Sequence, residues 1–166
     1  DTSELPWRLK PEVAGGGLFM DLAPHAIDLI QYLLGAVTTV QASVQNFSQI
    51  AAVEDHVSAV FTLDNGVTGV GQWDFSGANY ADEMVIRGER GTVAFGIHST
   101  DPLVVCNENG EQSIPHETPA VIQEPMISDV VGAINGRAQH ATNAHSAARV
   151  NWVTDQILTD FPWKTP

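Results

Sequence analysis

The feature that most constrains the fold is a run of short strand-like segments with no helix between them. From residue 40 to residue 114, six or seven segments either alternate apolar with polar residues or form short apolar runs. Turn sequences such as Asp64-Asn65-Gly66 and Asn109-Gly110 separate these segments. Parallel neighbours need long crossover connections, whereas tight turns join antiparallel strands, so we expect a mostly antiparallel sheet.

Helical patterns flank the strands on both sides. Apolar residues recur every three or four positions over residues 18–34, around residues 126–134 and from about residue 145 to residue 158. This order predicts an α+β fold: an open-faced, mostly antiparallel mixed sheet of about six or seven strands, with helices packed on one face. Pro24 leaves two alternatives for the first helix, which either begins near Asp21 or kinks at the proline.

Size, charge and cysteine content narrow the class of protein. The 166 residues, 43% of them hydrophobic, are enough for one domain with its own core over residues 1–166. A formal net charge of −13 argues against nucleic acid and anionic membranes as partners, because phosphate groups are bound by clustered Lys and Arg. The single cysteine, Cys106, allows no internal disulfide, which suits a reducing, cytoplasmic compartment. We expect Cys106 to be an ordinary strand residue rather than a nucleophile.

The ends of the chain lead to two further expectations. No run of eighteen apolar residues and no charged-then-apolar leader occurs, so we expect neither a membrane span nor a signal peptide. Because the sequence starts at Asp1 without a methionine, we expect it to be a piece of a longer protein.

The sequence lacks the glycine-rich turn that holds a dinucleotide in Rossmann folds. That turn has the pattern Gly-x-Gly-x-x-Gly between a strand and a helix. The pair Gly69 and Gly71 lacks the third glycine, and the triplet Gly15-Gly16-Gly17 follows a proline-bearing loop. We therefore predict no cofactor-binding residues in this chain. The triplet has two open interpretations: close packing at a helix start, or a backbone that lets a ligand approach the free N–H groups of the helix.

Three polar side chains interrupt the apolar face of the first helix. Asp21, His25 and Asp28 are spaced at i, i+4 and i+7, which places them on one face. A carboxylate one turn from a histidine can orient the imidazole and favour its charged form, which is the minimal arrangement for general acid–base catalysis. The alternatives are a capping aspartate with a partly buried, hydrogen-bonded histidine, or a metal site. No third metal ligand is indicated nearby, so we predict no metal.

Nearly the whole chain resembles the C-terminal domain of the Gfo/Idh/MocA oxidoreductases, the family of glucose–fructose oxidoreductase and inositol dehydrogenase. The specific part of the resemblance is the block that runs from the glycine triplet through Asp21, His25 and Asp28 to Gly35. The other matching segments are Trp7-Arg8, Glu54-Asp55-His56-Val57, Asp64-Asn65-Gly66-Val67, Ile86-Arg87-Gly88-Glu89-Arg90-Gly91-Thr92 and the final helices around Gly136-Arg137 and residues 145–158.

The resemblance implies that this chain is the substrate-binding and oligomerisation half of an NAD(P)-dependent oxidoreductase. A hydride would pass between the nicotinamide and a carbinol carbon of a sugar or polyol. An N-terminal Rossmann domain, absent from this sequence, would bind NAD or NADP and supply a catalytic lysine. His25 matches the family's proton-transferring histidine and Asp21 the carboxylate beside it, and this chain alone is expected to be inactive. The alternatives are NAD-assisted glycoside or lyase-type chemistry, and a non-catalytic ligand-sensing or assembly domain.

Four further residues complete the predicted substrate site. Gly16 and Gly17 would bring backbone close to the substrate. Arg8 could bind a hydroxyl or phosphate oxygen, or could be a surface arginine packed along Trp7. Tyr80 could line the substrate cleft or anchor its own loop.

One face of the predicted sheet is suited to self-association. Its residues are neither strongly charged nor strongly apolar, and helices would cover the opposite face. Because members of the family that this chain resembles commonly pair through the sheet, we expect a homo-oligomer. The face consists of Gln41, Ser43, Gln45, Ser58, Val60, Thr62, Thr68, Val70 and Gln72.

Overall fold

The computed structural model describes residues 5–137 and 143–162, which fall into two compact units. The first unit comprises Asp1–Ala78 and Thr142–Pro166, and the second comprises Asn79–Ala141. Both units combine antiparallel strands with helix, which confirms the predicted α+β class.

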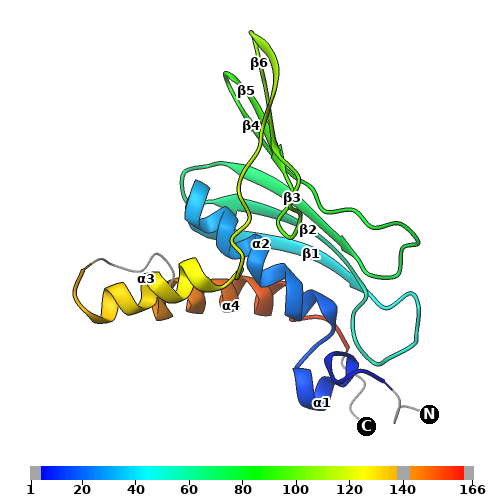
Figure 1. The fold of residues 1–166 in the computed structure, drawn as a ribbon. Coiled ribbons are helices and arrows are strands. Elements are labelled where there is room, and N and C mark those ends of the chain that lie inside the picture. Colours follow the sequence, from blue (N-terminus) through cyan, green and yellow to red (C-terminus); the bar gives the residue numbers. More distant parts are fainter. Residues whose placement is uncertain (1–4, 138–142, 163–166) are drawn as a thin grey trace. The chain divides into compact units, whose positions relative to one another are not determined.

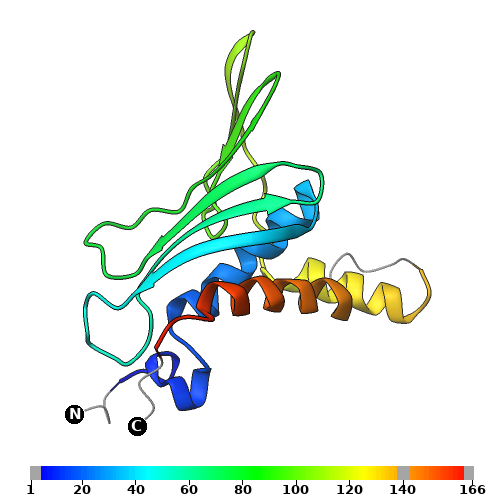
Figure 2. The same ribbon diagram turned by 180° about the vertical axis from the view of Figure 1, so that it is seen from behind.

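The first unit is a three-stranded antiparallel sheet with two long helices on one face. The strands β1 (Val37–Gln45), β2 (His56–Leu63) and β3 (Thr68–Asp74) lie in the order β1-β2-β3. Figure 1, and Figure 2 from behind, show α2 (Leu18–Leu34) and α4 (Ala144–Leu158) crossing the same side of this sheet.

Alternation along β2 decides which face of the sheet is buried. Ala59 and Phe61 lie in the core, whereas Val60 between them is 53% exposed. The apolar faces of both helices pack against the same side, and together they seal one core. The core consists of Phe19, Ala23, Ile27, Val37, Val57, Ala59, Phe61, Leu63, Val150, Val153, Ile157 and Leu158.

The helix α2 begins earlier than Asp21 and contains Pro24. Its N-cap is Gly17, and it is continuous to Leu34, so the start near Asp21 that the proline allowed is not what the chain adopts. Pro24 cannot donate to the carbonyl four residues earlier, but its fixed φ suits a helix. Gly35 ends α2 with a φ of 115°, a region that glycine enters without a steric penalty.

Helical elements lie near both ends of the first unit. Two short helical turns, η2 (Trp7–Leu9) and α1 (Pro11–Ala14), precede α2. The helix α4 begins at a capping box, in which the Asn143 side chain accepts hydrogen bonds from the backbone amides of His145 and Ser146 at 2.9 and 3.2 Å. This cap confirms the predicted last helix and places its start at Ala144.

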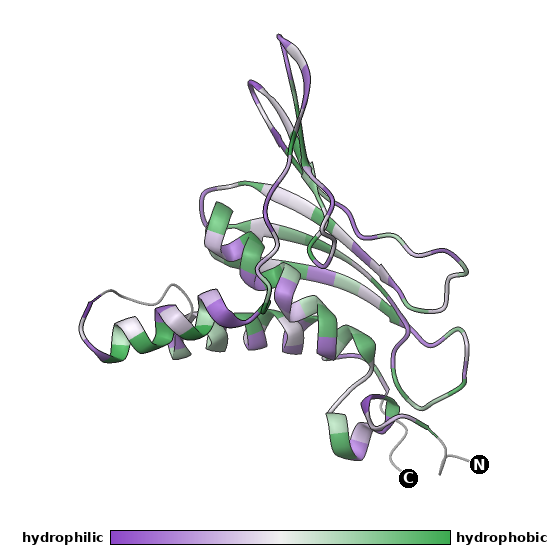
Figure 3. Ribbon diagram, in the orientation of Figure 1, coloured by the Kyte–Doolittle hydropathy of each residue, from purple (hydrophilic) through white to green (hydrophobic). Residues whose placement is uncertain are grey.

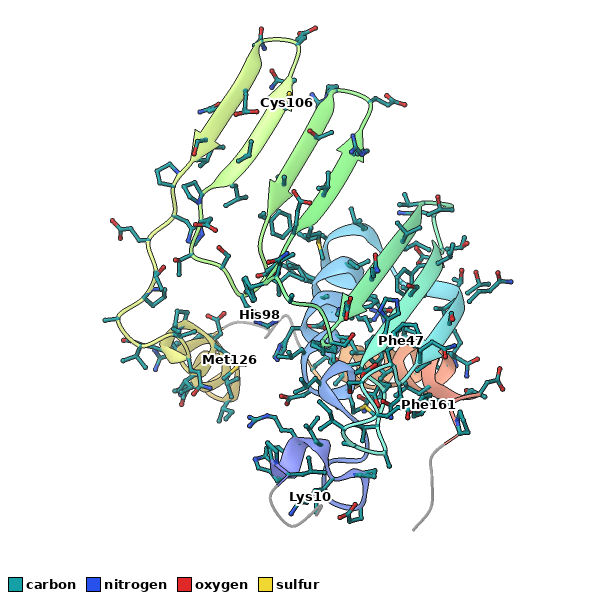
Figure 4. All side chains as sticks on the ribbon, turned by 90° about the vertical axis from the view of Figure 1, so that its right-hand side faces the viewer. Lys10, Phe47, His98, Cys106, Met126 and Phe161 are labelled. Atoms are coloured by element: carbon teal, nitrogen blue, oxygen red, sulfur yellow. The ribbon has the colours of Figure 1, made fainter. Side chains whose placement is uncertain are left out.

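The second unit holds the other four strands and one helix. The strands β4 (Met84–Gly88), β5 (Gly91–Phe95), β6 (Leu103–Asn107) and β7 (Gly110–Ile114) form an antiparallel sheet in chain order. The helix α3 (Glu124–Ile134) follows them, and none of its residues is fully buried. Cys106, labelled in Figure 4, lies on β6 and is exposed, so it is a strand residue as predicted.

The single sheet expected from the sequence is replaced by two sheets. The antiparallel pairing and the number of strands agree with the prediction, but within the described residues no ladder joins β3 to β4. Residues 75–83 contain no strand: the Asp74 carboxylate accepts hydrogen bonds from Ser76, which closes a turn, and Asp82 binds backbone amides of the β5–β6 connection. Alternation shows which side of a strand is apolar, but it does not identify the neighbouring strand.

One stretch of the first unit has the length and hydropathy of a membrane-spanning helix. Pro11–Leu34 reaches a mean hydropathy of 1.2 over 18 residues without being a continuous apolar run. The core helix of a soluble protein passes the same test, and Phe19, Ala23 and Ile27 of this stretch are core residues. Figure 3 shows hydrophilic residues between the hydrophobic ones along α2. We therefore interpret the stretch as a core helix.

Candidate functional site

Asp21, His25 and Asp28 lie on the side of α2 that is turned away from the core. His25 is exposed, and Asp21 and Asp28 are half-buried, whereas Ala23 and Ile27 are buried. One helix therefore contributes to the core with one face and presents Asp21 and His25 with the other. A proton-transferring side chain has to be reachable in this way.

Arg8 forms an ion pair with Asp21. The Arg8 Nε atom donates to Asp21 Oδ2 at 2.7 Å, and the guanidinium carbon lies 4.6 Å from the centre of the Trp7 ring. The Arg8 side chain therefore packs along Trp7, as one interpretation expected, and also contacts Asp21 of the predicted site. Whether Arg8 binds substrate stays a prediction. The Arg8 and Asp21 side chains are 49% and 37% exposed, so the pair is solvated and adds at most about 1 kcal/mol to stability. Its main effect is to orient the Asp21 carboxylate.

A buried carboxylate, Glu54, binds the N-terminus of α2 from the core side. The Gly17 amide donates to both of its oxygens, at 2.8 and 2.9 Å, and the Met20 amide donates to Oε1 at 3.3 Å. Glu54 is only 1% exposed. Burial raises the pKa of Glu54, and the hydrogen bonds from backbone amides offset part of that rise. Two of the amides at the start of α2, which a helix leaves without internal partners, are thus bound by a side chain that lies just before β2.

Glu54 explains why position 17 is a glycine. Gly16 and Gly17 are both buried, and a Cβ atom on Gly17 would lie 2.5 Å from the backbone carbonyl oxygen of Glu54. The φ of Gly17 is −96°, which any residue can adopt, so the requirement is for space. Close packing at the helix start therefore accounts for Gly17, and its amide is bound by protein. A substrate contact through Gly16 or Gly17 stays a prediction.

The neighbouring carboxylate, Asp55, serves a different segment. Its two oxygens accept hydrogen bonds from the amides of Phe47 and Ser48, each at 2.8 Å, in the loop between β1 and β2 where Figure 4 labels Phe47. Burial raises the pKa of Asp55, but the hydrogen bonds from Ser48 and Phe47 outweigh it, so that this pKa is lowered. The role of Glu54 is not predicted by the sequence patterns. The available signal was a pair of adjacent carboxylates directly before an apolar strand.

Two of the remaining expectations concern other parts of the chain. Tyr80 belongs to the second unit and is 83% exposed there, and its role stays a prediction. Within residues 5–137 and 143–162, no group of three His, Cys, Asp or Glu side chains is arranged to hold a metal ion. Two open pockets of about 440 and 420 Å³ lie along the end of β1 and the end of α4 and share Val44, Gln45, Asp160 and Phe161. Neither pocket includes a predicted site residue.

The face of the first sheet opposite α2 and α4 is accessible over most of its area. At its centre, Gln41, Val60 and Val70 are cross-strand neighbours on β1, β2 and β3. Val60 is 53% exposed and Val70 84% exposed. Of the nine residues predicted to form the face, Ser58 and Thr62 are half-buried and the others are exposed.

Comparisons with known sequences point to one family. The sequence model described as the GFO/IDH/MocA C-terminal domain matches residues 1–94. "Oxidoreductase P35" of Formosa agariphila is 33% identical over 153 residues, which are 92% of this chain and 47% of that protein. Levoglucosan dehydrogenase of Pseudarthrobacter phenanthrenivorans is 25% identical over an alignment 129 residues long, which covers 63% of this chain and 33% of that protein. The chain thus spans less than half the length of each of these relatives.

Solved structures share the fold. Levoglucosan dehydrogenase in complex with NADH and levoglucosan matches with a TM-score of 0.83 at 21% identity, over 95% of this chain and 52% of that chain. UDP-N-acetylglucosamine 3-dehydrogenase GnnA from Acidithiobacillus ferrooxidans matches with a TM-score of 0.78 at 19% identity, over 93% of this chain and 49% of that chain. At these identities the likeness establishes the fold alone.

Proposed function

This chain belongs to the GFO/IDH/MocA family, and we propose that it forms the substrate-binding half of an NAD(P)-dependent oxidoreductase. The enzyme would transfer a hydride between the nicotinamide and a sugar or polyol. The observation that carries this proposal is an exposed His25 one turn after Asp21, within the segment that the family shares. The names of the relatives support the substrate class and the cofactor, since one of them was solved with NADH and levoglucosan.

Two glycines from the candidate glycine-rich segments, Gly71 and Gly17, do not fit a dinucleotide. A Cβ atom on Gly71 would lie 2.5 Å from the Trp73 ring, so the space beside this glycine is filled by an aromatic side chain. The amide of Gly17 is bound to Glu54 and is not available to a phosphate. We therefore assign the cofactor to a separate N-terminal Rossmann domain, where the bound nicotinamide supplies the hydride acceptor or donor.

The proposed reaction leaves one proton for this chain to move. Oxidation of a carbinol releases a hydride to the cofactor and a proton from the hydroxyl group, and His25 accepts that proton. In the reverse direction, His25 returns the proton to the carbonyl oxygen. Asp21, oriented by Arg8, either contacts the same substrate hydroxyls or helps to orient the His25 side chain.

Two other functions use the same site differently. In NAD-assisted glycoside or lyase-type chemistry the cofactor is oxidised and restored within one cycle, so no net cofactor turnover is seen. A ligand-sensing or assembly domain would show no turnover of either kind. Net reduction of NAD or NADP by a free sugar therefore separates the proposed function from both.

We expect this chain alone to bind neither NAD nor NADP, because it lacks the glycine-rich turn that would hold the phosphates. Calorimetric titration of the chain with each dinucleotide checks this, and micromolar affinity would contradict it. The protein that joins this chain to its Rossmann domain should reduce one of the two dinucleotides in the presence of a suitable pyranose or polyol. Absence of reduction across a broad panel of sugars and polyols would count against the oxidoreductase.

We also propose that the open sheet face pairs two copies of the chain. Val60 and Val70 lie at its centre, so Val70→Arg should place a charge in the contact and shift the assembly to monomer. Val13→Arg is the control, because Val13 is also exposed but lies on α1, away from the sheet. Light scattering at high protein concentration measures both. A monomeric unmodified chain would contradict the proposal.

A further inference from the structure

Glu54 has a place in the first unit that its role as a helix cap does not fully explain. The N-cap residue of α2 is Gly17, which has no side chain, and the amides of Gly17 and Met20 are bound by the Glu54 carboxylate, 37 and 34 positions away in the sequence. A serine or aspartate at the N-cap could bind the Met20 amide locally, but not the amide of residue 17 itself. Because Glu54 is distant in the sequence, its hydrogen bonds also connect the first turn of α2 to the segment that leads into β2.

The residues that Glu54 binds adjoin the predicted catalytic pair. The Met20 amide, at 3.3 Å from Glu54 Oε1, belongs to the residue directly before Asp21. His25 follows five residues after Met20, about 7.5 Å along the helix axis at the standard rise of an α-helix. Displacement of the first turn of α2 would therefore move Asp21 and His25 with it.

The two sides of α2 make different contacts near its first turn. Glu54 binds from the core side and is 1% exposed, so it does not touch a substrate. Asp21 and His25 lie on the accessible side of the same helix. All three hydrogen bonds described for the Glu54 carboxylate come from backbone amides, so its contacts hold main chain and leave the catalytic side chains unobstructed.

We propose that Glu54 is a positioning residue of the oxidoreductase site: by holding the Gly17 and Met20 amides, it fixes where α2 presents Asp21 and His25. This inference rests on the proposed function of His25. A displacement of about 1 Å in a catalytic group can lower kcat about a hundredfold, so the expected effect of losing the anchor is on the chemical step.

The test uses Glu54→Gln in the protein that carries both halves, with Asp55→Asn as the matched control. Both changes neutralise a buried carboxylate that accepts two or more backbone amides, but Asp55 binds the β1–β2 loop and not α2. Glu54→Gln should lower kcat by roughly 10- to 100-fold, with KM changed far less. Hydrogen exchange at the Gly17 and Met20 amides should be faster by roughly tenfold or more, since these amides lose charge-assisted partners. Asp55→Asn should change neither measurement.

The outcomes separate the inference from the function on which it rests. Faster exchange at Gly17 and Met20 with an unchanged kcat would make Glu54 a helix cap only and would overturn the positioning role. An equal loss of kcat in Asp55→Asn would also overturn it. If Glu54→Gln does not fold, Glu54→Asp retains the charge at a shorter reach and should show a smaller loss of kcat in the same direction. Full activity in His25→Ala would instead remove the proposed function, whatever the Glu54 variants do.

Discussion

His25→Ala, in the protein that contains both halves of the enzyme, is expected to lower kcat by roughly 10²–10⁴-fold. The reason is that His25 takes and returns the hydroxyl proton, and alanine cannot do either. The same change should leave the melting temperature of this chain within about 1–2 °C, because surface substitutions away from caps and cores usually alter stability by less than about 0.5 kcal/mol. Steady-state kinetics on the enzyme and thermal unfolding of the chain check the two halves of this prediction.

Asp21→Asn accompanies this experiment. It should give a smaller loss of kcat than His25→Ala, because it disturbs the orientation of His25 or of a substrate hydroxyl without removing the proton acceptor. Its effect on stability should be small, since the ion pair that it weakens is solvated. If both residues were structural, the pattern would invert: both variants would melt at lower temperature, and the folded enzyme would keep its turnover.

Gly17→Ala is expected to have the largest effect on stability. The added methyl group would lie 2.5 Å from the Glu54 carbonyl oxygen, which is backbone and cannot rotate away. Overpacking of this kind costs about 1–3 kcal/mol, which corresponds to a fall of roughly 2–12 °C in the melting temperature of a chain of this size. Thermal or urea-induced unfolding of the chain measures it.

Gly69→Ala is the matched control for Gly17→Ala. Gly69 lies on β3, and a Cβ atom there would meet nothing within 4 Å. The melting temperature of Gly69→Ala should equal that of the unmodified chain or be slightly higher, because alanine reduces the entropy of the unfolded chain. Equal melting temperatures for Gly17→Ala and Gly69→Ala would contradict the prediction, because a methyl group at position 17 would then cost no stability.

The site could be predicted from the sequence only as far as its residue types. The spacing of Asp21 and His25 places them on one helical face whatever the rest of the fold is, and the structure presents that face to solvent. Arg8 was a candidate because it is a cation in the matching segment, but its contact with Asp21 was not foreseen. Glu54 had no assigned role, because nothing near it in the sequence indicates that it binds the start of α2.

Local patterns by themselves determined the elements of this protein. Periodicity placed the strands and the helices α2, α3 and α4, but not the short η2 and α1, and glycine and asparagine placed the turns, because these depend on residues only a few positions apart. The tertiary structure alone decided which elements meet. It separated seven strands into two sheets, joined Arg8 to Asp21 across 13 positions, and joined Glu54 to Gly17 across 37. A strand edge or a carboxylate can accept many partners of the same chemistry, and only packing selects one of them.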